Sequence, residues 1–166
     1  MFTKKSIVFV LALLLSACGY HLRGALELPA NMKNVYVEGG SGLLHQQFGQ
    51  IMKTSSAQLV SSRKGAGIVI KILNEDFNRR VLSLGAAGKT NEFELVYRLD
   101  YEFANASDTP LMERQTVEVR REYFNDVQQF VLAKDNEEAV IRNEMYQQAV
   151  HTIVNRARVV LEADAK

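Results

Sequence analysis

The feature that most constrains the fold of this chain is a stretch of regular alternation between residues 93 and 103. Apolar or aromatic side chains occupy every odd position of this stretch: Phe93, Leu95, Tyr97, Leu99, Tyr101 and Phe103. The even positions are mostly charged. Successive side chains of a β-strand point to opposite faces, so this period of two predicts a strand with one buried face and one polar face.

Neighbouring stretches extend this strand into a sheet. Residues 116–123 alternate in the same way, and a β-branched run from Ile68 to Leu73 precedes the first stretch and continues through residues 81–84. Turn-forming residues at 85–88 and 105–110 separate the three runs. Alternating runs joined by short turns predict an antiparallel meander. A further short strand is predicted at Val35–Val37.

Two segments have the period of an amphipathic helix. The first begins after Ser41, which we expect to cap it, and its apolar face comprises Leu44, Phe48, Ile51 and Met52. The second is predicted from Asp135 to Ala163, because Asp135 and Glu138 have the spacing of a capping box. Its predicted apolar stripe comprises Ala139, Tyr146, Ala149, Val150, Ile153, Ala157 and Val160.

One stripe on each helix and one apolar face of the sheet must be buried together. The sequence therefore predicts an α+β, two-layer sandwich. Two helices pack on one face of a mostly antiparallel four-stranded sheet, in the order β-α-β-β-β-α. The other face of the sheet is charged, and no segment is left to cover it.

The amino terminus is typical of an exported lipoprotein. Lys4 and Lys5 precede a short apolar run, Ile7–Leu15, which has the pattern of a secretory signal peptide and is too short to span a membrane. The sequence Leu-Ser-Ala-Cys that ends at Cys18 resembles the lipobox of bacterial lipoproteins. This resemblance implies removal of residues 1–17, acylation of Cys18 and a single lipid-anchored domain at 18–166. Gly19, in place of an aspartate, points to the outer membrane.

Composition argues against several classes of function. The chain has 20 Lys and Arg residues against 19 Asp and Glu residues, so it lacks the strong positive field that nucleic-acid binding requires. Its three histidines are far apart and it has one cysteine, so no spacing supports a metal site. Gly85–Gly88 and Gly39–Gly42 each miss a residue of the phosphate-loop or nucleophile-elbow pattern. We expect no catalytic residues, no cofactor and no enzymatic activity.

Cationic side chains beside turns are the remaining candidates for binding. Arg79 and Arg80 precede the turn at 85–88, Lys89 follows it, and Lys134 lies just before the predicted long helix. Lys and Arg are the natural partners of phosphate groups, so these residues could contact a phosphorylated ligand. Ordinary solvated surface charge is the alternative interpretation of each.

Two segments resemble the lipopolysaccharide-assembly lipoprotein family LptE: residues 18–24 at the proposed anchor, and residues 123–146 around the sequence Leu-Ala-Lys-Asp-Asn-Glu-Glu. The resemblance implies helices on an antiparallel sheet. It also implies a plug inside the LptD β-barrel that assists barrel assembly and delivery of lipopolysaccharide to the cell surface. Cys18 matches the lipidated position, and Lys134 matches a lysine implicated in lipopolysaccharide contact. The family's second basic contact falls near the turn at 85–88, where Lys89 and Arg80 are the candidates.

The main hypothesis is therefore an outer-membrane lipoprotein on the periplasmic side and in the barrel lumen, with LptD and lipopolysaccharide as partners. An alternative is a free, periplasm-facing lipoprotein that binds a small ligand or glycan in a deep apolar pocket. A hydrolase would need a nucleophile and a base that converge in a cleft, and the sequence offers no such pair.

Overall fold

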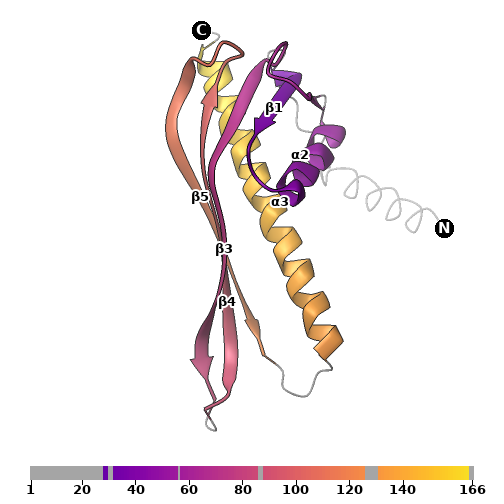
Figure 1. Cartoon of the computed structure of the whole chain (residues 1–166), viewed down its shortest axis with the longest axis vertical. Helices are drawn as coiled ribbons and strands as arrows, with labels where there is room; N and C mark the ends of the chain where they lie inside the picture. The colour runs from indigo at the N-terminus through magenta and orange to yellow at the C-terminus, as the bar shows by residue number, and fades with distance from the viewer. Residues whose placement is uncertain (1–27, 30–31, 56, 86–87, 126–130, 165–166) are drawn as a thin grey trace, which may run out of the picture.

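The computed structural model describes residues 28–29, 32–55, 57–85, 88–125 and 131–164, without the side chains of residues 131–136 and 164. The signal segment, Cys18 and Gly19 lie outside these residues. The described elements are β1 (Asn34–Glu38), α2 (Gly42–Thr54), β2 (Gln58–Leu59), β3 (Ile68–Leu84), β4 (Thr90–Ala104), β5 (Pro110–Phe124) and α3 (Val131–Asp164). Both helices lie on the same side of one sheet (Figure 1).

The sheet has five strands in the order β2-β1-β3-β4-β5. The antiparallel meander is confirmed, because β3 pairs with β4 and β4 with β5 in antiparallel register. β1 pairs in parallel with β3 and with β2. The α+β class is confirmed, but the strand count of four is not. β2 adds the fifth strand and has only two residues, too few to show an alternating pattern.

The alternation along β4 has the structural meaning that the sequence predicts. The side chains at positions 95, 97, 99, 101 and 103 are fully buried, and Phe93 near the end of the strand is half-buried. Val117 and Val119 of β5 are buried on the same face. This face packs against the helices.

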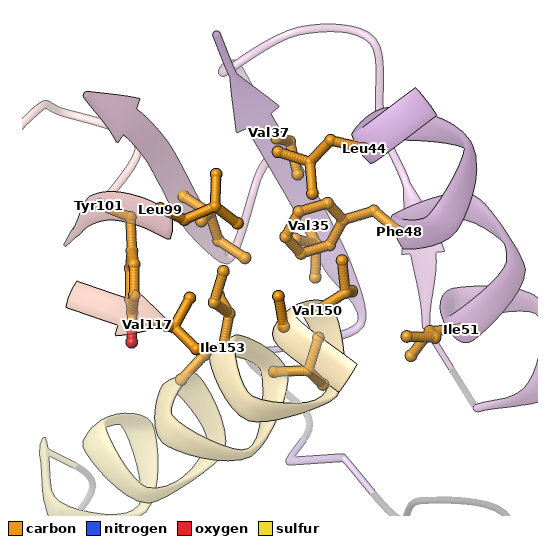
Figure 2. Packing of buried hydrophobic residues seen from close by; sticks show 14 of the residues in the cluster. Val35, Val37, Leu44, Phe48, Ile51, Leu99, Tyr101, Val117, Val150 and Ile153 are labelled. Atoms are coloured by element: carbon orange, nitrogen blue, oxygen red, sulfur yellow. The ribbon is translucent and has the colours of Figure 1, made fainter. Parts of the chain in front are cut away.

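The first helix begins as the sequence predicts. The Ser41 hydroxyl accepts a hydrogen bond from the backbone N–H of Leu44 (3.3 Å) and caps α2. The predicted apolar face is buried against the sheet and α3. Figure 2 shows Leu44 and Phe48 of α2 pointing toward Val35 of β1 and toward Val150 of α3. The core is therefore centred where α2 crosses β1 and α3.

The long helix begins four residues before the predicted start, at Val131, so Asp135 lies inside it and the capping-box prediction is wrong. Glu138 binds side chains of β3 and β5 instead. The apolar stripe is confirmed from Tyr146 onward, but Ala139 is exposed. Three further side chains that the predicted stripe omits are buried: Met145, Val154 and Leu161.

The charged face of the sheet is partly covered, contrary to expectation. Val69 of β3 and Ala104 of β4 are fully buried on this face. They form a second apolar cluster with Ala66, and Val60 and Tyr36 pack against it. The connection between β2 and β3 therefore folds over one end of this face. The remainder of the face carries charged side chains.

Candidate functional site

The turn between β3 and β4 places Lys89 at the tip of a long hairpin (Figure 1). The backbone N–H of Gly85 donates to the carbonyl of Lys89 (2.8 Å), and Gly88 has a φ of +70°, a conformation that favours glycine. The Lys89 side chain is exposed, and no described carboxylate lies within ion-pair distance of it. We call this end of the molecule, formed by residues 77–85, 88–97 and 119–124, the distal end.

Arg80, the second candidate near this turn, lies on the sheet face opposite the helices. Its guanidinium forms an ion pair with the carboxylate of Glu94, whereas its side chain remains 60% exposed. Arg80 is therefore a paired cation with free hydrogen-bond donors, and Lys89 is an unpaired one among the described residues. The hairpin brings both to the distal end.

Lys134 lies in the first turn of α3, not before the helix as the sequence analysis predicts, because the helix begins at Val131. Its side chain is outside the described part. The start of α3 lies at the same end of the molecule as the tip of the β3–β4 hairpin (Figure 1). The fold therefore gathers the backbone positions of the three candidates, Arg80, Lys89 and Lys134, toward one end.

Large apolar side chains are exposed at this same end, a feature that the sequence analysis does not predict. The exposed fractions are 50% for Val81, 41% for Leu82, 64% for Leu84 and 70% for Phe124. These residues end β3 and β5 beyond the part of the sheet that α2 covers (Figure 1). Clustered exposed apolar side chains mark surfaces that bind apolar ligands, membranes or proteins. The distal end therefore combines apolar and cationic groups.

A polar network joins α3 to the distal half of the sheet. The carboxylate of Glu138 accepts hydrogen bonds from Arg79 Nη1 (2.9 Å), Tyr123 Oη (2.9 Å) and Arg142 Nη2 (3.1 Å). Arg142 also stacks over the ring of Phe77, with 4.0 Å from its guanidinium carbon to the ring centroid. Among the described side chains of α3, polar contacts therefore hold the helix around Glu138, whereas apolar packing holds it from Met145 onward.

The network sets the ionisation of Glu138. Partial burial raises the pKa of this carboxyl, but the hydrogen bonds from Tyr123, Arg79 and Arg142 outweigh it and hold the pKa below its ordinary value. Burial, together with the Glu138 charge, raises the pKa of Tyr123. Glu138 is therefore a carboxylate near neutral pH, and Tyr123 is a neutral hydrogen-bond donor to it.

A cavity of about 750 Å³ opens beside this network, at the junction of α2, β3 and α3. It is lined by Leu43, Arg79, Glu138, Ala139, Val140, Arg142 and Asn143. The mixture of two arginines, a glutamate and exposed apolar side chains differs from the deep apolar pocket that a free ligand-binding lipoprotein predicts. A second cavity, of about 480 Å³, lies at the edge of β1 and includes His45 and Val60.

The adjacent carboxylates Glu75 and Asp76 lie on opposite faces of the sheet, because they pair with the buried Leu99 and the exposed Arg98, respectively. Glu75 is held by the start of α2. It accepts hydrogen bonds from the backbone N–H and the hydroxyl of Ser41 (2.6 and 2.8 Å). Glu75 therefore supports the start of α2 and does not form a catalytic pair with Asp76.

No described helix is both long enough and apolar enough to cross a bilayer. Within the same residues, no group of three or more histidine, cysteine, aspartate or glutamate side chains is placed to hold a metal ion.

Comparison with known proteins identifies similar chains. A family model described as LptE, lipopolysaccharide-assembly, matches residues 32–157. The chain is 27% identical to the LPS-assembly lipoprotein LptE of Photorhabdus laumondii, over 96% of this chain and 87% of the relative. It is 29% identical to the protein of the same name from Pectobacterium atrosepticum, over 91% and 83% of the two chains.

Solved structures agree with the fold. The solution structure of lipoprotein B from Nitrosomonas europaea is 29% identical, with a TM-score of 0.70, and the match covers 87% of this chain and 94% of that one. The crystal structure of rare lipoprotein B from Shewanella oneidensis has a TM-score of 0.64 at 20% identity, over 80% and 98% of the two chains. The arrangement of two helices on one side of the sheet is therefore shared with lipoproteins of known structure.

Proposed function

The chain belongs to the LptE family of lipopolysaccharide-assembly proteins, and from this premise we propose that it is a non-enzymatic lipoprotein with a role in lipopolysaccharide assembly. The match of the family model over residues 32–157 is the observation that carries this proposal. In finer terms, the protein plugs the LptD β-barrel, helps to assemble it and takes part in delivering lipopolysaccharide to the cell surface.

We place lipopolysaccharide binding at the distal end. Lipid A, the anchor of lipopolysaccharide, carries phosphate groups and acyl chains. The exposed ammonium of Lys89 and the half-exposed guanidinium of Arg80 suit the phosphates. The apolar side chains that β3 exposes nearby, Val81 and Leu84 among them, suit the acyl chains. Lys134, in the first turn of α3 at the same end, is the third candidate.

The anchor and the barrel complete the proposal. After removal of residues 1–17, acylated Cys18 attaches a single domain at 18–166 to the periplasmic side of the outer membrane. Several acyl chains give lasting attachment, whereas one chain alone binds a membrane only marginally. The lumen of a membrane barrel is polar and wet, so a plug needs a polar surface over its own core. The charged sheet face supports this role.

Co-purification tests the proposed function. The full-length chain with a carboxyl-terminal tag is expressed in its native bacterium, and the outer membranes are extracted with mild detergent. We expect a large β-barrel protein to be recovered with it in constant proportion, identified by mass spectrometry as LptD. Repeated recovery of the tagged chain as a monomer, without a barrel, would favour the free lipoprotein instead.

Charge reversal at the candidate lysines is expected to weaken lipopolysaccharide binding. Lys134→Glu and Lys89→Glu should each reduce the affinity about tenfold, since each removes a charge-assisted contact and places a repelling carboxylate near phosphate. Titration of purified lipopolysaccharide measures this. Recovery of the barrel should stay at the wild-type level. Lys53→Glu, at an exposed position near the end of α2, is the matched control. If neither lysine variant changes the affinity for lipopolysaccharide, both lysines are ordinary surface charges.

A further inference from the structure

The sheet face opposite the helices carries an unbroken chain of alternating charges across β3, β4 and β5. Seven side chains take part, each in an ion pair with the next, in the order Arg80, Glu94, Arg120, Glu118, Arg98, Asp100 and Arg114. Two of these contacts, from Arg120 Nη2 to Glu118 Oε1 and from Arg114 Nη2 to Asp100 Oδ2, are 2.6 Å long. We call these seven residues the charge ladder.

The two signs lie at different depths. The carboxylate side chains are 6% exposed at Glu94, 5% at Asp100 and 30% at Glu118, whereas the four arginine side chains are 49–60% exposed. The acids therefore lie against the strands and the guanidinium groups cover them. The outermost groups of the ladder are therefore its four guanidinium groups, and the exposed carboxylates of Asp76 and Glu122 lie beside them on the same face.

The acids also hold the arginines in place. The hydroxyl of Thr116 and the guanidinium of Arg114 donate to Asp100 and lower the pKa of its carboxyl, so the anion persists under the cations. A guanidinium has five N–H donors, and an ion pair uses one or two of them. The remaining donors of Arg98 and Arg120 are free to bind a second acceptor, with much of their rotational freedom already lost.

We propose that the charge ladder is a docking surface for a protein wall lined with carboxylates, and that on the proposed function this wall is the inner surface of the LptD barrel. Several half-exposed arginines spread over one face of three neighbouring strands, β3, β4 and β5, match an extended wall. The two cavities described above are lined by residues from other parts of the molecule. Charge complementarity of this kind steers association and fixes the orientation of partners.

The double variant Arg98→Gln/Arg120→Gln tests this surface with little risk to the fold. Both deeply buried acids keep a cation, since Glu94 retains Arg80 and Asp100 retains Arg114. The control is Lys53→Gln/Lys64→Gln, which removes the same charge from exposed positions elsewhere on the chain. Circular dichroism and the unfolding midpoint establish that each variant is folded, and the single variants replace the double variant if it is not.

Recovery of the barrel with each tagged, full-length variant is measured from 50 to 500 mM salt. We expect the double variant to recover about tenfold less barrel than wild type at low salt, and to lose less of it as salt rises. The control should match wild type. Wild-type recovery by the double variant overturns the docking surface and leaves the proposed function standing. Undiminished barrel recovery with weakened lipopolysaccharide binding also overturns it, because the ladder would then serve the glycolipid. Failure of the wild-type chain to recover a barrel overturns both proposals.

Discussion

Replacing Glu75 with alanine should lower the free energy of unfolding by about 3 kcal/mol, because three hydrogen bonds end on this carboxylate. Two come from Ser41 at the start of α2, and the third comes from the hydroxyl of Tyr97 (3.0 Å). Tyr97 is fully buried, and burial together with the Glu75 charge raises the pKa of its phenol. Removing the carboxylate leaves a buried donor without its partner and a helix start without its anion.

Chemical denaturation of the two variants at neighbouring positions measures this effect. Asp76→Ala is the matched control, since Asp76 is exposed on the opposite face of the same strand. We expect that variant to stay within about 0.5 kcal/mol of wild type. An equal loss from both substitutions would mean that Glu75 is ordinary surface charge and that α2 depends on apolar packing alone.

Glu138→Gln should lower the free energy of unfolding by about 2 kcal/mol at neutral pH, since it leaves Arg79 and Arg142 without their shared carboxylate. The loss should be local. This network holds α3 around Glu138, where Ala139 and Val140 are exposed. Amide hydrogen exchange in α3 around Glu138 should therefore accelerate, while exchange around Ile153 in the apolar core stays slow.

The pH dependence of stability distinguishes the contribution of the Glu138 charge from the contribution of the packing of its side chain. The pKa of Glu138 is lower in the folded chain than in the unfolded one, so its contribution is complete above the unfolded value, near 4.5, and is lost as pH falls through the folded value. Wild type should lose its advantage over Glu138→Gln between about pH 5 and pH 3. Glu144→Gln, at an exposed position on the same helix, should change neither stability nor its pH profile. A constant difference between wild type and Glu138→Gln at every pH would contradict an ionic role.

The alternation along β4 predicts most of this fold, because each apolar side chain in it points to the same, buried face of the sheet. The helix cap at Ser41 could also be predicted from the sequence, since its donor and acceptor lie three residues apart in the chain. β2 could not be predicted in this way. Gln58 and Leu59 form a strand only because β1 lies beside them in the folded chain.

The polar contacts of Glu138 and Glu75 could not be predicted from the sequence for a related reason. Glu138 has the spacing of a capping box, yet its partner Arg79 is 59 residues away in the chain. Glu75 likewise meets Ser41 across 34 residues. The burial of the acids in the charge ladder could not be predicted either. Alternation shows that Glu94 and Arg98 share a face of the sheet, but it does not show which of the two side chains is buried. The sequence shows the sign of each charge, but it does not show which residue that charge contacts in the folded chain.

The parallel pairing of β1 with β3 has a consequence for the order in which the molecule assembles. β4 follows its partner β3, and β5 follows its partner β4, after one short turn each, whereas β1 and β3 are separated in the chain by α2 and β2. Closing the longer connection costs more chain entropy, so the meander should form early and β1 should join it late. β1, the described strand nearest in sequence to the proposed anchor at Cys18, is therefore the last strand to complete the central part of the sheet.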